Sequence, residues 1–160
     1  MKVFKEIFKT VGEQSGLKIK TLVLPPIRAH SHFKEGKADA IFPAFEEEMS
    51  DSFNRSLCFA KKMDYLFYLK GRPPAKVMLE NKYKIAVVRG YFHPSKTLKN
   101  FSKSLFTVDS AEAGMRMLVS KRVDLFLVDN ISAVTSLLLK DFPEIRFNSK
   151  EPIDETCSFF

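Results

Sequence analysis

Two stretches of the chain, 33–42 and 118–127, share one pattern that constrains the fold more than any other feature. They read FKEGKADAIF and LVSKRVDLFL. In each, apolar residues at helical spacing lead into a short basic turn, then an aspartate, then an apolar run typical of a buried strand. Both stretches therefore predict the same helix–turn–strand joint, as expected of a chain that builds two α/β units. Chance similarity between short units of this kind is the alternative interpretation.

The rest of the chain alternates between helix-like and strand-like segments. Apolar spacing and the positions of Gly and Pro predict helices at 1–16, 25–36, 93–101, 111–121 and 130–142. They predict strands at 17–24, 38–45, 57–71, 84–90, 104–110, 123–129 and 145–149, and an extended segment at 150–160. Strands separated by helices of this length imply parallel pairing with crossover helices, so we expect an α/β fold.

The segment RPPAK at 72–76 is the clearest boundary in the sequence. Two prolines after Gly71 favour an extended connector, and the strand–helix pattern begins again beyond it. We therefore expect two α/β units, each with a sheet of its own.

Composition excludes several classes of function. Apolar residues make up 45% of the 160 residues, enough to bury a core. No apolar run approaches the roughly 18 residues that span a bilayer. The net charge of +7 is spread along the chain without a basic helix, zinc-finger spacing or RNA-binding motif, so we expect no nucleic-acid partner. The first 16 residues carry an apolar stripe with Lys and Glu between, so we expect an amphipathic helix there rather than a signal peptide.

The sequence contains no recognisable catalytic or metal-binding motif. Cys58 and Cys157 are too few and too widely spaced for a zinc site or a disulfide framework, and the three histidines form no metal-ligand motif. No nucleophile elbow, phosphate loop or Cys–His signature is present. His93 stands near Ser95, but no third group is evident that would activate a nucleophile. We therefore expect no enzyme activity, no metal and no cofactor.

Three segments carry the motifs of one protein family. LPPIRAHSHFKEGKADAIFPAF at 24–45 is similar to a proline–x–x–arginine helix followed by a GkaDai stretch. YKIAVVRGY at 83–91 is similar to a kiGvvrGt strand, and VDSAEAGMRMLVSKRVDLFLVDNISAVTSLL at 108–138 is similar to the helix–strand segment that follows it. In this order the segments resemble extracellular solute-binding proteins of family 3, the periplasmic type II binding proteins of amino-acid-type ABC transporters.

The resemblance implies a two-lobed periplasmic-binding-protein type II fold whose lobes close on a small ligand. Lobe 1 would comprise 1–72, with 150–160 returning to it, and lobe 2 would comprise 76–149. The family's first strand would precede Met1, and its last strand and helices would follow Phe160. By this comparison we expect a chain truncated at both ends, with lobe 1 incomplete.

Four residues are candidates for ligand binding. Asp129 ends a predicted strand, and the matching Asp of the family holds the ligand's amino group; capping the next helix is its alternative role. Arg28 lies in the first turn of a predicted helix and could pair with a carboxylate, with a surface salt bridge as the alternative. The Gly90–Tyr91 turn offers backbone N–H groups at a predicted helix start, which suit a carboxylate.

Three further polar residues are expected to have structural roles. Ser110 should cap the helix at 111–121. Asp39 and Asp124 should fix the turns that precede their strands.

Family members that bind α-amino acids usually carry Thr or Ser, and then Arg, just after the strand that matches 38–45. Here that region reads EEEMSDSFNRS, and Arg55 comes later than the family pattern requires. The expected ligand is therefore a small polar solute that is amino-acid-like or related, and not necessarily a standard α-amino acid.

The function that the resemblance implies is capture of this solute in the periplasm for uptake by an ABC transporter. The membrane subunits of the transporter would then be the protein partners. A ligand-sensing input domain of a signalling receptor shares the fold and is the alternative.

A lobe 1 without its first strand would leave a strand edge and an apolar face open, which favours self-association. In the alternative, segment 155–160 folds back to fill the gap, with Cys157 near Cys58. Spacing along the sequence cannot by itself place two cysteines within bonding reach.

Overall fold

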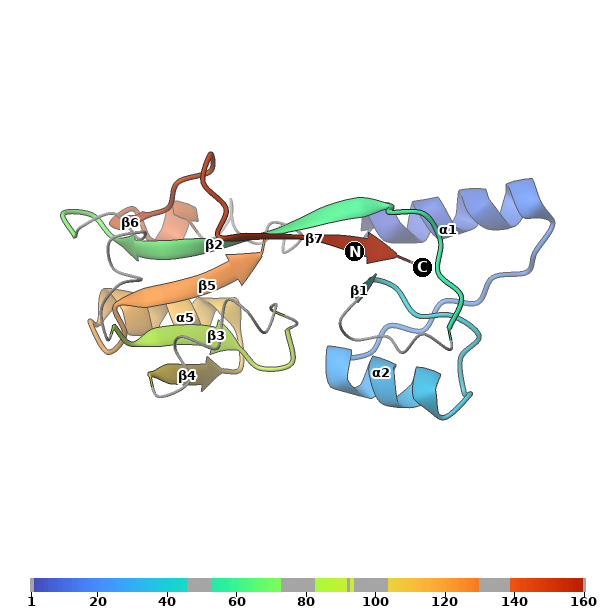
Figure 1. Ribbon diagram of the computed structural model, residues 1–160, viewed down its shortest axis with the longest axis horizontal. Helices are drawn as coiled ribbons and strands as arrows, with labels where there is room; N and C mark the ends of the chain where they lie inside the picture. The colour runs from blue at the N-terminus through green and yellow to red at the C-terminus, as the bar shows by residue number, and fades with distance from the viewer. Residues whose placement is uncertain are drawn as a thin grey trace. The chain divides into compact units, whose positions relative to one another are not determined.

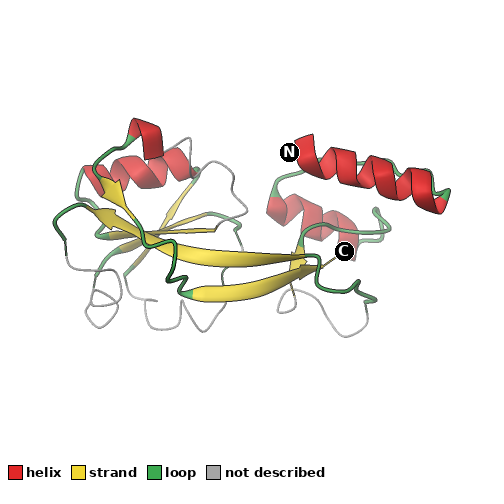
Figure 2. Cartoon of the chain, turned by 90° about the horizontal axis from the view of Figure 1, so that it is seen from above, coloured by secondary structure: helices red, strands yellow, loops and turns green. Residues whose placement is uncertain are grey.

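The computed structural model of the chain describes residues 2–45, 53–72, 83–91, 93, 104–129 and 139–159 (Figures 1 and 2). These residues fall into two compact units, Met1–Asp39 and Ala40–Phe160. The first, unit 1, is helical, whereas the second, unit 2, contains every described strand (Figure 1).

Unit 1 consists of helices α1 (Lys2–Ser15) and α2 (Pro26–Lys34), joined by a loop. Both helices lie where the sequence predicts them. α1 ends at Gly16, whose φ of +72° lies in the left-handed region that glycine adopts without strain. α2 begins with Pro at its first position, where the fixed φ of proline suits a helix.

The strand predicted at 17–24 is wrong. This segment has no regular secondary structure, and Leu17 and Leu22 are 65% and 66% exposed. A strand is stable only when its backbone N–H and C=O groups pair with a neighbour, and no described strand pairs with this segment. The alternation of apolar residues predicted a strand here, but it could not show whether a neighbouring strand is available for pairing.

Unit 2 is built on a mixed sheet with helix α5 (Ala111–Val119) packed on one face (Figure 1). Its strands are β1 (Ala44–Phe45), β2 (Ala60–Leu69), β3 (Ile85–Val88), β4 (Leu105–Val108), β5 (Leu125–Asp129), β6 (Ile145–Arg146) and β7 (Asp154–Phe159). The order is β1-β7-β2-β5-β3-β4, and β6 pairs with β2. β3 is parallel to β4 and to β5, whereas β1, β2, β6 and β7 pair antiparallel. The predicted α/β class is confirmed.

Most elements predicted in unit 2 are confirmed in shortened form. The exception is the strand predicted at 38–45, of which only Ala44–Phe45 pairs with a neighbour. Ser110 caps α5 as predicted, because its Oγ accepts a hydrogen bond from the N–H of Ala113 at 3.1 Å. The helix predicted at 93–101, and most of the one predicted at 130–142, lie outside the described residues.

Strand β2 changes its partner at Asp64. Residues 60–64 pair with β7, and residues 64–67 pair with β5. The hydrogen-bond ladder is continuous through this point, so the expectation of a separate sheet in each α/β unit is wrong. Its cause is the length of β2, which at 10 residues exceeds the length of either partner.

The lobe boundaries at 1–72, 76–149 and 150–160 remain predictions. The core shows how closely the two sides of the predicted boundary are joined. Phe67 precedes that boundary, yet it packs in the cluster beneath α5.

The core of unit 2 lies on both faces of β3 and β5. On the face toward α5 the fully buried side chains are those of Phe67, Ala86, Met115, Leu118 and Phe126. On the opposite face the buried side chains are those of Leu66, Ile85, Val87, Leu125 and Leu127. Burying one large apolar side chain contributes about 1.5–3 kcal/mol. Strands buried on both faces read as unbroken apolar runs, which explains IAVV and LFLV.

The two repeated stretches of the sequence share the same helix end. In the first, Gly36 has a φ of +68°, and the next N–H donates to the carbonyl five residues earlier at 2.9 Å. In the second, Lys121 has a φ of +58°, and the equivalent hydrogen bond is also 2.9 Å. This is a Schellman-type helix end in both cases. The helix end and turn of the predicted repeat are therefore confirmed, whereas only the second stretch continues directly into a strand, β5.

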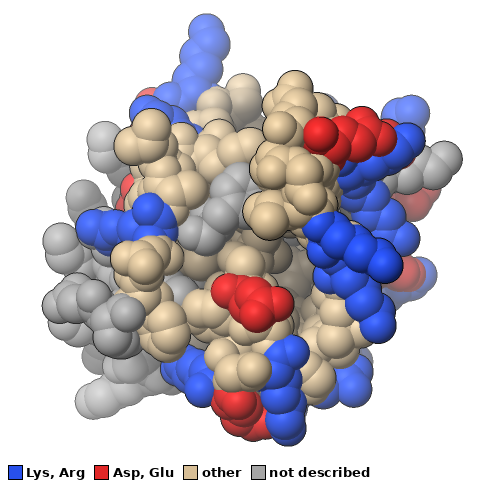
Figure 3. Space-filling view, turned by 90° about the vertical axis from the view of Figure 1, so that its right-hand side faces the viewer, with Lys and Arg blue, Asp and Glu red and all other residues tan. Residues whose placement is uncertain are grey.

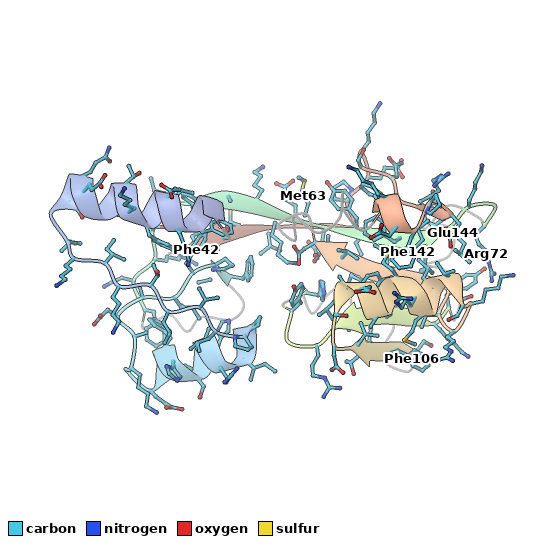
Figure 4. All side chains as sticks on the ribbon, turned by 180° about the vertical axis from the view of Figure 1, so that it is seen from behind. Phe42, Met63, Arg72, Phe106, Phe142 and Glu144 are labelled. Atoms are coloured by element: carbon cyan, nitrogen blue, oxygen red, sulfur yellow. A yellow bond between two sulfur atoms is a disulfide. The ribbon has the colours of Figure 1, made fainter. Side chains whose placement is uncertain are left out.

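Asp124 follows the second joint and holds the start of β5, as predicted. Its Oδ2 accepts a hydrogen bond from the N–H of Lys84 at 3.1 Å, which ties the start of β5 to the start of β3. Its Oδ1 lies 3.7 Å from a guanidinium nitrogen of Arg72. Figure 4 shows Arg72 and Glu144 at the same end of unit 2, where the N–H of Lys70 donates to the carbonyl of Glu144 at 2.8 Å.

Strand β7 lies between β1 and β2. Ser158 pairs with Phe45 on one side and with Ala60 on the other. Cys157 forms a disulfide with Cys58, with a Cα–Cα distance of 5.4 Å. The alternative in which the segment from 155 onward folds back is therefore confirmed, together with the proximity of the two cysteines.

Removal of the disulfide should lower the free energy of unfolding by about 4.7 kcal/mol in the chain-entropy model, because the bond closes a loop of roughly 100 residues in the unfolded chain. Urea unfolding of the oxidised protein and of a Cys58→Ser/Cys157→Ser variant measures this difference. The variant should be insensitive to reductant, which controls for side effects of the reagent. Equal midpoints for the two proteins would contradict the prediction.

Light scattering on the same samples tests the predicted self-association, which a stable monomer at all concentrations, with and without reductant, would rule out.

Replacement of Gly114 by Ala should destabilise the protein by about 1–3 kcal/mol, the usual cost of overpacking a core. An added Cβ at this position would lie 2.4 Å from two ring carbons of Phe126, because α5 approaches β5 closely there. Urea unfolding of the Gly114→Ala, Phe126→Leu and double variants tests this. The smaller Leu side chain should relieve the clash, so the double variant should lose less stability than the sum of the single changes. Strictly additive losses would show that the contact is not responsible.

Candidate functional site

The carboxyl ends of the parallel strands β3 and β5 form one edge of unit 2. β3 ends at Val88 and β5 ends at Asp129, and their register pairs Ile85 with Leu125. In parallel α/β sheets, ligands bind beyond the carboxyl ends of the strands. Three of the four predicted ligand-binding residues are at this edge: Gly90 and Tyr91 in the turn after β3, and Asp129.

The turn after β3 presents the side chain of Tyr91. Gly90 has a φ of +77°, which turns the chain, and the N–H of Tyr91 then donates to the carbonyl of Val88 at 3.2 Å. This N–H is therefore used within the turn. Tyr91 is 38% exposed, so a bound molecule can contact this residue.

Asp129 is buried at the last position of β5, with 5% of its surface exposed. In the antiparallel register it stands directly opposite Asp64 of β2. Directly opposed residues of an antiparallel pair point to the same face of the sheet, with their Cβ atoms about 5 Å apart. The same register pairs Asp64 with Asp154 of β7 on its other side. Three aspartates therefore form a row across three neighbouring strands.

Asp64 holds two basic side chains, one with each carboxylate oxygen. Its Oδ1 lies 2.5 Å from the Nζ of Lys62, and its Oδ2 lies 3.2 Å from the Nδ1 of His93. The three side chains are only 3%, 1% and 1% exposed for Lys62, Asp64 and His93 respectively. Because His93 follows the turn after β3, this cluster connects that turn to strand β2.

The buried charge of Lys62 is balanced locally. The Asp64 carboxylate supplies the opposite charge, and the ring of Phe45 lies 5.7 Å from the Lys62 Nζ, a distance at which a cation attracts an aromatic face. Moving an ammonium group out of water costs several kcal/mol, which only close partners of this kind offset. Among the described residues no group of three or more His, Cys, Asp or Glu is arranged to hold a metal ion.

Arg28, the fourth predicted residue, belongs to unit 1. It lies in the first turn of α2, as predicted, and it is exposed. Two residues later, burial and, to a smaller extent, the nearby Lys34 lower the pKa of His30. The structure thus brings Gly90, Tyr91 and Asp129 to one edge of unit 2 and places Arg28 in the other unit.

Sequence analysis missed Lys62 and Asp64 and gave His93 no role. In β2 the charged residues alternate with Met63, Tyr65 and Phe67, a pattern that indicates a solvent-exposed face. The opposite is found, because both charged side chains are buried. A signal was available: the apolar residues Leu66 and Tyr68 continue the same face, and a face with both kinds of residue is seldom fully solvated.

Side chains of both charges lie on the face shown in Figure 3. On the face shown in Figure 3, uncharged side chains occupy much of the area between Lys and Arg, and acidic residues are interspersed. In the described parts of the chain, no helix combines the length and the apolar character required to cross a membrane.

Comparison with solved structures shows the fold. The GluR0 ligand binding core in complex with L-glutamate matches with a TM-score of 0.72 and 12% identity, over 96% of this chain and 72% of that one. A truncated, arginine-bound ArgBP from T. maritima matches with a TM-score of 0.72 and 16% identity, over 96% of this chain and 74% of that one. The substrate binding protein of an amino acid ABC transporter matches with a TM-score of 0.68 and 16% identity, over 96% of this chain and 70% of that one. The chain therefore has the two-lobed periplasmic-binding-protein type II fold.

No family model matches the chain. No curated protein sequence matches it either. The similarity is thus one of structure, and the structures that share the fold are ligand-binding proteins.

Replacement of Asp64 by Asn should destabilise the protein by about 3–5 kcal/mol, because it removes a counter-charge that contacts the buried ammonium group of Lys62. Urea unfolding measures the loss. The Asp109→Asn variant is the matched control, since Asp109 makes an ion pair with Arg89 at 3.2 Å but its side chain is 86% exposed. Such a surface pair contributes at most about 1 kcal/mol. A Lys62→Met/Asp64→Leu variant, which removes both charges, should recover most of the stability, and similar losses in the Asp64→Asn and control variants would show that the buried pair is not important.

Proposed function

We propose that this chain binds a small polar solute, amino-acid-like or related, in the interlobe cleft that its fold type forms. The observation that carries the proposal is the fold itself, shared over 96% of the chain with structures that contain L-glutamate or arginine. A fold alone does not establish a function, so the residues of the site must account for the chemistry.

Asp129 is the residue that we propose for the ligand's amino group. It is a carboxylate at the carboxyl end of β5, buried at 5% exposure, where its attraction for a cation is little screened by water. Tyr91, with its exposed side chain, would line the same edge, and Gly90 would allow the chain to turn there. Arg28 would pair with a carboxylate of the ligand through its two parallel N–H groups.

The biological role that we propose is capture of the solute in the periplasm for an ABC transporter, without enzyme activity and without a cofactor. The Cys58–Cys157 disulfide supports an oxidising compartment, since such bonds are rare in the reducing cytosol. The match with the substrate binding protein of an amino acid ABC transporter supports the transport role. The membrane subunits of a transporter would be its partners, and no nucleic acid would be.

The second candidate function is a ligand-sensing domain of a signalling receptor. The observation that favours it is the match with the GluR0 ligand binding core, which has the same TM-score as the arginine-bound protein. Ligand binding is common to both functions. Co-purification with transporter membrane subunits from cells would support transport, and its absence with a bound ligand would favour sensing.

Replacement of Asp129 by Ala should weaken the binding of an amine-bearing ligand by about 2–5 kcal/mol, the cost of removing one partner of a buried charge pair. Isothermal titration calorimetry with a panel of amino acids and polyamines measures the affinity. Asp141→Ala is the matched control, because it removes the same charge from an exposed position. Unchanged affinity in Asp129→Ala would refute the role of this residue, and failure of every member of the panel to bind would refute the proposed class of ligand.

A further inference from the structure

His93 is a buried polar side chain that the proposed function does not use. Only 7% of the residue is exposed, and the Nδ1 atom of its ring contacts Asp64, the middle aspartate of the row. Both ring nitrogens are inaccessible to solvent, and neither makes a hydrogen bond in the described part of the chain. Buried polar atoms are nearly always hydrogen-bonded, so this arrangement requires an explanation.

Asp64 determines which nitrogen of His93 carries the proton. The Oδ2 of Asp64 lies 3.2 Å from Nδ1, a close contact that does not have the geometry of a hydrogen bond. A bare nitrogen lone pair would be repelled by a carboxylate oxygen at this distance, whereas an N–H is attracted. We therefore assign the proton to Nδ1. In the neutral imidazole this leaves Nε2 as a hydrogen-bond acceptor.

The surroundings of His93 favour a positively charged donor over a neutral one. Asp129 stands opposite Asp64 on the same face of the sheet, and Asp154 stands on the other side of Asp64. Lys62 supplies a positive charge in this cluster, and it lies 2.5 Å from the Oδ1 of Asp64. The His93 ring thus contacts the middle carboxylate of the row, and its Nε2 is buried without a hydrogen bond in the described part of the chain.

We infer that Nε2 of His93 accepts a hydrogen bond from a second cationic N–H group of the ligand. The ligand class is then a small molecule with two such groups: a basic amino acid with an ammonium or guanidinium side chain, or a diamine. Asp129 would hold one group, and His93 would select for the other. This inference rests on the proposed function and narrows it, and it makes His93 a specificity-determining residue.

A purely structural histidine would behave differently. Its replacement would change stability and would weaken all ligands to the same extent. A specificity-determining acceptor affects only those ligands that carry the second donor, because a site built around a buried acceptor rejects an analogue that cannot satisfy it. The ligand dependence of the effect therefore separates the two roles.

The experiment compares matched pairs of probes by isothermal titration calorimetry on the full chain. L-Arginine is paired with L-citrulline, which has the same shape without the charge, and L-lysine is paired with L-norleucine. Putrescine distinguishes a diamine from a basic amino acid. The unmodified protein should bind each cationic member more tightly than its neutral partner by about tenfold or more, since a hydrogen bond to a charged group is stronger than a neutral one.

Two variants of His93 test the residue itself. His93→Leu removes the acceptor and should lower the affinity for L-arginine about 10–100-fold while changing that for L-citrulline by less than about threefold. His93→Gln places an amide oxygen near the position of Nε2 and should retain most of the preference. Thermal melting checks that each variant is folded. If His93→Leu does not fold, His93→Gln and the nitrogen NMR shifts of the unmodified protein carry the test, since the Nε2 resonance should move on addition of L-arginine.

The outcomes distinguish this inference from the function on which it rests. Failure of all probes to bind would overturn the proposed function. Binding without a preference for the cationic member of each pair, an equal loss for all ligands in His93→Leu, or an Nε2 resonance that does not respond to L-arginine would overturn the role of His93 and leave solute binding in place.

Discussion

The architecture of unit 2 depends on one strand that serves two sets of partners. β2 pairs with β7 over its first half and with β5 over its second half, and Asp64 belongs to both ladders. At this residue the sheet cannot be covered by apolar side chains alone, because Lys62, Asp64 and Asp129 are all buried close to it. The ion pair of Lys62 with Asp64 keeps these charges compatible with burial. Asp64 therefore takes part both in the backbone pairing of β2 with two strands and in the buried ion pair.

The elements that the sequence predicted correctly are those with strong local signals. Proline begins α2, glycine or a basic turn ends a helix, and unbroken apolar runs mark β3 and β5. The strand predicted at 17–24 was wrong because a strand needs a neighbouring strand to pair with, and the periodicity of apolar residues carries no information about such a partner. The burial of Lys62 and Asp64 was not predicted, because charged residue types indicate exposure. These two side chains are buried only because of the contacts that the tertiary structure brings together. Charged residues inside a strand are thus the positions where sequence patterns are least informative.

For the candidate site, the sequence predicted which residues lie at the strand ends but did not predict the contacts between their side chains. Gly90, Tyr91 and Asp129 lie at the carboxyl edge because strand ends can be read from the sequence. The position of His93 against Asp64 could not be read, since the two are 29 residues apart and belong to segments of different pattern. Similar structures bind amino acids, but at identities of 12–16% they share the fold and not the side chains.

The position of β7 has a consequence for the order in which the protein assembles. β1 and the first half of β2 have β7 as their shared neighbour, and β7 is made almost 100 residues after β2 begins. The helix α5 and strands β3, β4 and β5 are close together in sequence and can pack before that segment exists. Closing a long loop is entropically costly and slow compared with local pairing. During synthesis the first half of β2 thus lacks its β7 neighbour, and this open edge is exposed to other chains until β7 has been made.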